Sequence, residues 1–255
     1  MPADRTPPSD PTRSSGTAGA PDRTVPEPSS GLVREWTACA LVRAAARFVP
    51  VPYLDDAVSE RATRLAVTRT LRAHGRRYPS RAVEPLYAGD GGGFLRSLSS
   101  IPRKVLLFPV RKYTKIAGAV TGVPNDITRV LLLGRATHRR LALGELAGDD
   151  RSALQHEASQ VRTAFDVVVD EMDLQLLRGA VADGLGEVKD LTGAVVEYAR
   201  GRFGSSKGDD EAVPAPEGAV AEGAEKVEQA LERPEIVRLL AEFDRRMDQQ
   251  LAARA

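Results

Sequence analysis

Two adjacent carboxylates, Asp55 and Asp56, are the first candidates for chemistry, because they end the proline-led stretch VPVPYLDD. A catalytic acid and base must converge on one substrate, whereas neighbouring residues of a helix point about 100° apart. An aspartate at a helix start accepts hydrogen bonds from unpaired backbone N–H groups and complements the positive end of the helix dipole. We therefore interpret Asp55 and Asp56 as helix-start residues.

A second stretch, GVPNDITRV, has a similar layout, with Pro124 leading into Asn125 and Asp126. The two stretches are either a degenerate internal repeat or the same helix-start pattern used twice. An enzyme that uses Asp55, Asp126 or His138 in a pocket is the least favoured function, because no converging base or metal ligand accompanies these residues.

The three histidines, His74, His138 and His156, match no metal-binding motif. A metal site needs several ligands at fixed spacing, and the chain has no His-x-x-x-His, His-Glu-x-x-His or Cys-x-x-Cys. His138 lies on the apolar face of a predicted helix, so we interpret it as a satisfied core or interface histidine. The glycine-rich residues 89–94 lack the Lys-Ser/Thr of a phosphate loop. The sequence therefore predicts no catalytic residue, no cofactor, no metal site and no evident small-molecule substrate.

Cationic side chains are concentrated in the middle of the chain. Residues 61–140 carry 17 lysines and arginines against 3 acids, a net charge of +14, whereas residues 141–255 carry a net charge of −11. This split predicts either an anionic partner for the middle or electrostatic pairing between the two parts of the chain. The candidate residues for an anionic surface are Arg61, Arg64, Arg69, Arg72, Arg76, Arg103, Lys104, Arg111, Lys112 and Lys115.

The last five of these cations alternate with apolar and aromatic residues such as Phe108 and Tyr113. Such a mixture suits an anionic membrane surface, where each cation contributes about 1 kcal/mol. It also suits nucleic-acid phosphates. If these cations instead pair with the acidic C-terminal part of the chain, neither an anionic membrane nor a nucleic acid is needed as a partner.

The elements that position these residues are predicted to be helices. Apolar residues recur at a period of 3.6 in residues 31–48, 53–77, 126–146, 151–178 and 180–203. We expect an all-α bundle of roughly five to seven helices over residues 31–203. A disordered tail is expected at residues 1–30 and a flexible linker at 204–223, from their Pro, Gly, Ser and charge content.

Residues 224–255 are predicted to form an amphipathic C-terminal helix, with Pro234 in a first turn. This helix either packs back on the body or docks into a protein partner. Its apolar stripe consists of Ile236, Leu240, Phe243, Met247 and Leu251.

The composition predicts a cytoplasmic protein. Cys39 is the single cysteine of the 255 residues, so no internal disulfide can form. The N-terminal residues are polar, without the apolar core of a signal peptide. No apolar run approaches the roughly 20 residues of a membrane-spanning helix.

Two stretches resemble the EcsC-type helical proteins of bacteria: TGVPNDITRVLLLGRATHRRLAL at 121–143, and AFDVVVDEMDLQLLRGAVADGLGEVKDLTGAVVEYA at 164–199. The proline-led residues 48–78 are similar to the Pro-x-Pro-x-x-Asp-Asp opening of the related YcjF-type domains. The resemblance covers residues 48–200 and implies a helical, often membrane-associated protein with no established catalytic residues. This chain departs from those proteins in being rich in arginine and lacking long apolar hairpins, and no functional residue is carried over.

These observations favour a non-enzymatic regulatory or adaptor protein that binds a protein partner, peripheral at the inner membrane face through its basic middle segment. The alternative is a nucleic-acid-binding regulator, which the arginine content supports although no helix-turn-helix is visible.

Overall fold

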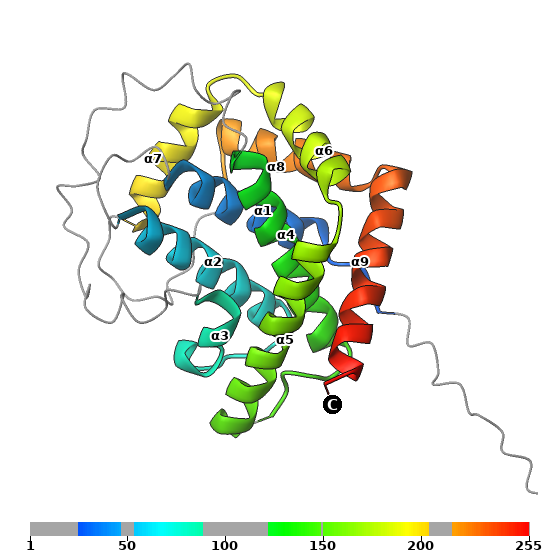
Figure 1. Cartoon of the computed structure of the whole chain (residues 1–255). Coiled ribbons are helices and arrows are strands. Elements are labelled where there is room, and N and C mark those ends of the chain that lie inside the picture. Colours follow the sequence, from blue (N-terminus) through cyan, green and yellow to red (C-terminus); the bar gives the residue numbers. More distant parts are fainter. Residues whose placement is uncertain (1–24, 47–53, 89–121, 149, 204–215, 255) are drawn as a thin grey trace, which may run out of the picture.

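The computed structural model describes residues 25–46, 54–88, 122–148, 150–203 and 216–254 (Figure 1). These residues form nine α-helices, one short 3-10 helix and no strand, which confirms the predicted all-α fold. The first helices are α1 (Ser30–Ala46), α2 (Leu54–Ala73), η1 (Ser80–Ala82) and α3 (Glu84–Tyr87). The later ones are α4 (Gly122–Ala142), α5 (Arg151–Glu171), α6 (Gln175–Gly186), α7 (Leu191–Phe203), α8 (Gly218–Leu231) and α9 (Pro234–Ala252).

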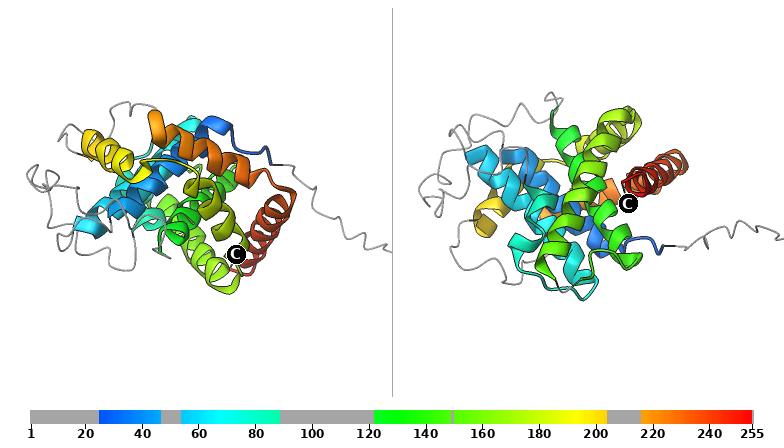
Figure 2. Two further views of the ribbon diagram at one scale, coloured as in Figure 1. Left: turned by 90° about the horizontal axis from the view of Figure 1, so that it is seen from above. Right: turned by 60° about the horizontal axis from the view of Figure 1, so that its bottom comes forward.

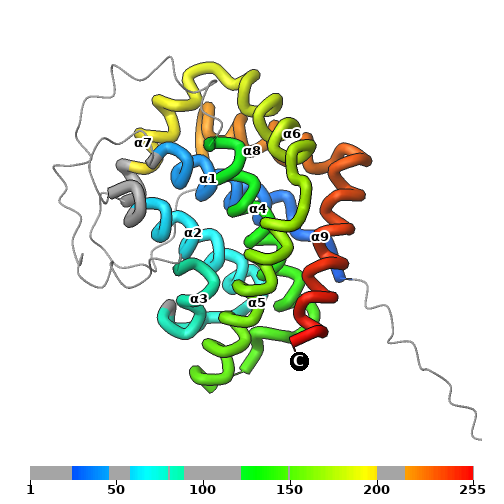
Figure 3. The backbone as a smooth tube through the Cα atoms, viewed as in Figure 1, coloured from blue at the N-terminus to red at the C-terminus, as the bar shows by residue number. Residues whose placement is uncertain are grey.

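Helix α1 forms the centre of the bundle, since it packs against α2, α4, α7 and α8 (Figure 3). Its apolar residues surround the helix instead of forming one stripe, and Val33, Trp36, Leu41 and Val42 are all buried. A helix that is apolar on every side belongs in the interior of a bundle. These four helices therefore cover α1.

Helices α1, α2 and α4 meet at Trp36. The indole N–H of Trp36 donates a 2.8 Å hydrogen bond to Oγ1 of Thr70 on α2. On α4, Gly134 faces the indole so closely that a Cβ at this position would lie 2.5 Å from Cδ2 of the ring. The absence of a side chain at Gly134 is therefore what allows α4 to approach α1.

The C-terminal helix α9 packs back on the body of the molecule, alongside α5 (Figure 1). Phe165 of α5 and Phe243 of α9 meet edge to face, with ring centroids 6.2 Å apart. Ile236 and Met247 are also fully buried, and Leu251 packs against the core. Of the two arrangements that the sequence left open, this structure has the packed one, and the stripe predicted for partner docking faces the protein's own core.

Three predicted boundaries differ from the observed ones. The helix expected at 151–178 stops at Glu171, and the Asp173 carboxylate then accepts a hydrogen bond from the Gln175 backbone N–H at the start of α6. A second break follows α6, where Asp190 has a positive φ of 54° before α7. Helix α8 begins at Gly218, inside the predicted linker, and turns sharply into α9 (Figure 2). Apolar spacing continues across the first two breaks, so periodicity did not reveal them.

Candidate functional site

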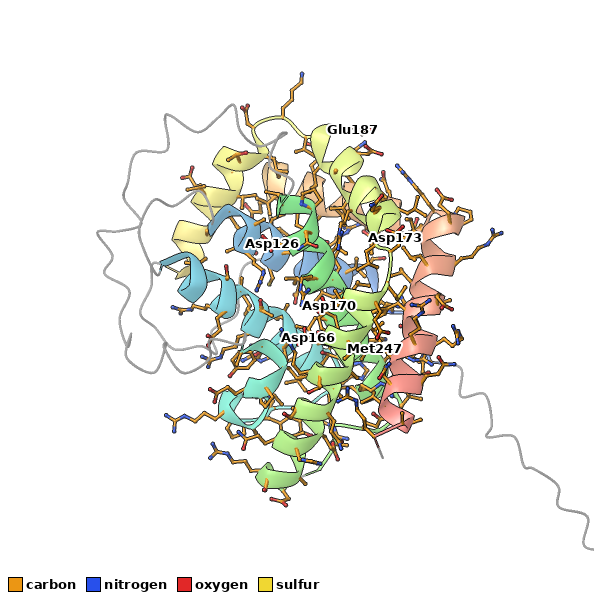
Figure 4. The ribbon with its side chains drawn as sticks, viewed as in Figure 1. Asp126, Asp166, Asp170, Asp173, Glu187 and Met247 are labelled. Atoms are coloured by element: carbon orange, nitrogen blue, oxygen red, sulfur yellow. The ribbon has the colours of Figure 1, made fainter. Side chains whose placement is uncertain are left out.

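Helix α4 carries a row of arginines, Arg129, Arg135, Arg139 and Arg140, which we call the α4 arginine row. Its partners include carboxylates of α5 and α9. Nη2 of Arg129 lies 2.9 Å from Asp166, and Nη2 of Arg139 lies 2.6 Å from Asp248. Asp166 and Asp170 lie one turn apart on α5 (Figure 4), and Asp170 also pairs with Arg129 at 3.5 Å. The positive charge of α4 is thus matched within the chain by its acidic C-terminal part.

Arg135 is an ion-pair centre with two carboxylate partners from different segments, and its side chain is 14% exposed. Its Nε and Nη2 donate to Asp244 of α9, at distances down to 2.8 Å, and its Nη1 and Nη2 donate to both carboxylate oxygens of Glu27 at 2.7 and 3.0 Å. Burial acts to lower the pKa of Arg135, but the hydrogen bonds to Glu27 and Asp244 outweigh it and raise that pKa above its ordinary value. Arg135 is therefore a permanent cation with two carboxylate partners.

At the C-terminal end of the row, Arg139 and Arg140 share the carboxylate of Asp248. Arg140 also donates to Glu145 at 3.1 Å. Burial acts to raise the pKa of Asp248, but the hydrogen bonds and charges of the two arginines outweigh it and lower that pKa. This cluster fixes the last turns of α9 against α4.

The segment 25–29 crosses α4 although the sequence placed it in the disordered tail. Glu27 reaches Arg135, and one residue earlier the Pro26 carbonyl accepts a 2.9 Å hydrogen bond from Nε2 of His138. The partners lie more than a hundred residues apart in sequence, so no local pattern signals these contacts. The hydrogen bond from Arg135 holds the pKa of Glu27 below its ordinary value, against partial burial.

His138 and His74 form a hydrogen-bonded pair, with Nε2 of His74 2.9 Å from Nδ1 of His138. Because the Pro26 carbonyl can only accept, Nε2 of His138 carries a proton and its Nδ1 accepts from His74. This confirms the interpretation of His138 as a satisfied buried histidine, whereas the pairing with His74 was not predicted. Burial, followed by the charges of His138 and Arg76, lowers the pKa of His74.

The histidine pair predicts a pH-dependent stability. Since folding holds the pKa of His74 below its ordinary value of 6.5, the unfolded chain binds this proton more tightly than the folded one. The free energy of unfolding should therefore be highest above pH 6.5 and fall as the pH drops through the lowered pKa. Urea unfolding of His74→Gln from pH 7.5 to 5 should give a shallower decline than the parent protein.

His156, which is exposed on α5, offers a matched control. His156→Gln should retain the parent slope, because this side chain is exposed and lies outside the histidine pair. If His74→Gln had the same slope as the parent protein, the pH dependence of the free energy of unfolding would come from groups other than His74.

The arginines predicted for an anionic surface on α2 reach different neighbouring helices. The Arg64 guanidinium lies 5.8 Å from the ring centroid of Tyr87 on α3, and Nε of Arg69 lies 3.7 Å from Glu35 on α1. Arg72 lies in the last turn of α2 and Arg76 follows the end of the helix, and both are half-buried. The other predicted cations, Arg103, Lys104, Arg111, Lys112 and Lys115, lie outside the described residues.

The aspartates of the two proline-led stretches differ in their positions. Helix α2 begins at Leu54, as the sequence predicts, but the side chains of Asp55 and Asp56 lie outside the described ones. Asp126 is not a helix-start residue, because α4 begins at Gly122 and Asp126 lies in its second turn. Its buried carboxylate lies 3.8 Å from Nε of Arg43 on α1 (Figure 4).

The catalytic alternative needs Asp126 and His138 to meet at one substrate. Both lie on α4, twelve residues apart, which corresponds to about 18 Å along the helix axis. They do not form one site. Within the described residues, no group of three or more His, Cys, Asp or Glu side chains is arranged to hold a metal ion.

A pocket of about 330 Å³ lies beside Arg135 and is bounded by α1, α4, α6, α8 and α9. Val33, Trp36, Leu132, Leu177 and Leu240 are among its apolar walls. Glu27, Arg135, Glu228 and Glu232 also line it. Five helices build this pocket, so the sequence pattern of any one of them does not reveal it.

None of the described helices has the length and apolar content needed to cross a bilayer. Comparisons of the chain with protein-family models, with curated proteins and with solved structures found no match. The resemblance to the EcsC-type and YcjF-type proteins therefore stays a prediction.

Proposed function

We propose that the protein is a non-enzymatic regulatory or adaptor protein that binds a protein partner at the cytoplasmic face of a membrane. An anionic lipid surface holds it there peripherally, through the cationic region at the end of α2 and η1. The observation that carries this proposal is the charge of residues 61–82, which contain seven arginines and no acid. Such a surplus attracts the anionic headgroups of a membrane.

The distribution of acids supports this assignment. The carboxylates of α5 and α9, such as Asp166, Asp244 and Asp248, are engaged by the α4 arginine row. They engage α4, and the residues of the region 61–82 carry a formal net charge of +7. Arg77 and Arg81 extend this region beyond the arginines predicted from the helix pattern, and both are exposed.

The non-enzymatic class is supported by the contacts of the residues that could do chemistry. Asp126 pairs with Arg43 in the interior, and both ring nitrogens of His138 are used in hydrogen bonds. These groups stabilise the packing of α1, α2 and α4, and the two on α4 are too far apart to act together.

Co-sedimentation with phosphatidylcholine vesicles, with and without phosphatidylglycerol, tests the membrane proposal. Binding should require the anionic lipid and be lost between about 0.05 M and about 0.5 M salt, because screening shortens the reach of exposed charges. The triple variant Arg76→Gln/Arg77→Gln/Arg81→Gln should bind about tenfold more weakly or worse, since each cation contributes up to about 1 kcal/mol.

Arg233→Gln/Arg238→Gln/Arg254→Gln is the matched control, because it removes the same charge from exposed positions at α9. It should bind vesicles nearly as the parent protein does. Equal weakening by both triple variants would indicate a net-charge effect and contradict the assigned surface. Binding to duplex DNA at the same salt, with none to anionic vesicles, would support the nucleic-acid alternative.

A further inference from the structure

The pocket beside Arg135 has the properties of a small-molecule site. Its volume of about 330 Å³ lies at the lower end of the usual range of about 300–1,000 Å³ for such sites. Its walls are mostly aliphatic, with Trp36 as the aromatic residue, and its charged groups are few. This combination suits a ligand with a compact apolar tail and one polar end.

Arg135 offers two edges of its guanidinium to two different carboxylates. Asp244 takes the edge formed by Nε and Nη2, and it is itself buried within α9. Glu27 takes the edge formed by Nη1 and Nη2, but its side chain is 73% exposed and comes from the short segment 25–29. The first carboxylate holds the guanidinium in place, and the second is in a position to exchange.

We propose that the pocket binds a medium-chain amphipathic carboxylate, whose carboxylate replaces Glu27 on Arg135 while its apolar tail enters between α1, α4 and α6. The exchange keeps Arg135 paired, since one carboxylate leaves as another arrives. Exposed ion pairs contribute little to stability, so the release of Glu27 costs little. The structure already has a carboxylate bound bidentately at this edge, which is the geometry that arginine favours.

The other charged side chains of the pocket influence whether the polar end of the ligand is anionic or cationic. Glu228 is matched by Arg34, whose Nε lies 2.6 Å from it, whereas Glu232 is exposed at the end of α8. Glu232 would favour a cationic end group over an anionic one. We assign the carboxylate because Arg135 alone offers a preformed pair of donors, and the cationic alternative is an outcome of the test.

Tryptophan fluorescence of the full chain reports on this pocket directly, because Trp36 lines it and is the single tryptophan of the protein. Titration with decanoate below its micelle concentration should give a saturable change at one site per chain. Under the same conditions, 1-decanol has the same tail without the charge and should bind at least about tenfold more weakly. Tighter binding of decyltrimethylammonium, or equal binding of decanol, would overturn the proposal.

Variants distinguish binding of the ligand in the pocket from nonspecific adsorption elsewhere on the protein. Glu27→Gln should bind decanoate about two- to fivefold more tightly, because it removes the competing carboxylate. Val237→Phe should weaken binding, since Val237 lines the pocket and is half-exposed, so the larger ring needs no rearrangement of the core. Leu176→Phe is the matched control at an exposed residue outside the pocket and should leave binding unchanged.

Arg135→Lys keeps the charge but loses the two-donor edge, and it should bind decanoate about tenfold more weakly. Urea unfolding of each variant shows that it is folded before binding is compared. No saturable binding to the parent protein, or no effect of Glu27→Gln and Val237→Phe, would place the ligand elsewhere. This site does not depend on the membrane surface at residues 61–82, so either proposal can fail without the other.

Discussion

Replacement of Gly134 by alanine is expected to lower the free energy of unfolding by about 2 kcal/mol. The new Cβ would lie 2.5 and 2.6 Å from ring carbons of Trp36, well inside contact distance. Trp36 is held in place, because its indole N–H is bonded to Thr70 and the residue is only 2% exposed. Overpacking of this kind usually costs about 1–3 kcal/mol and sometimes more.

The same substitution removes the helix cost of glycine, which works in the opposite direction by about 1 kcal/mol. Gly179 in α6 provides a matched control, since nothing lies within 4 Å of a Cβ added there. Gly179→Ala should therefore raise the free energy of unfolding slightly in the urea experiment that shows the loss in Gly134→Ala. If Gly134→Ala were as stable as the parent, the close contact between α1 and α4 would be contradicted.

Helix content and the main apolar faces follow from the sequence because each depends on residues close together in the chain. The stripe of Ile236, Phe243 and Met247 faces the core as its 3.6-residue period requires. Asp126 shows the limit of this reasoning. Its proline-led context is typical of a helix start, but tertiary contact with Arg43 favours a helix that begins four residues earlier.

The candidate sites were less predictable, because they join residues from distant segments. The charge split indicated that the basic middle could pair with the acidic part of the chain. It did not show that the α4 arginine row would be the part that pairs with α5 and α9. The contacts of Glu27 with Arg135 and of His74 with His138 span 108 and 64 residues. Only the packing of α1, α2 and α4 brings these groups together.

The ion pair of Arg135 and Asp244 should have the other large effect on stability. Arg135→Met would leave Asp244 buried without its bidentate partner, with Arg139 only at 3.9 Å. Removal of one member of a buried pair typically costs about 3–5 kcal/mol, because the remaining charge is left uncompensated. We expect a loss of about 3 kcal/mol in the free energy of unfolding, since 10% of the Asp244 side chain is still exposed.

The two partners of Arg135 should differ in their importance. Asp244→Leu should cost less than Arg135→Met, because Arg135 keeps Glu27, and Glu27→Gln should cost at most about 1 kcal/mol because its side chain is largely exposed. The double variant Arg135→Met/Asp244→Leu should be more stable than Arg135→Met alone, because two apolar side chains then replace the pair.

Urea unfolding of the parent protein, Arg135→Met, Asp244→Leu and the double variant completes a double-mutant cycle. The cycle gives the coupling free energy between Arg135 and Asp244 directly. We expect a coupling of about 2 kcal/mol or more. Additive losses would mean that Asp244 is stabilised by other groups, with Arg139 as the first candidate. A large loss in Glu27→Gln would mean that segment 25–29 fixes Arg135, and the exchange of carboxylates inferred for the pocket would then be too costly to occur.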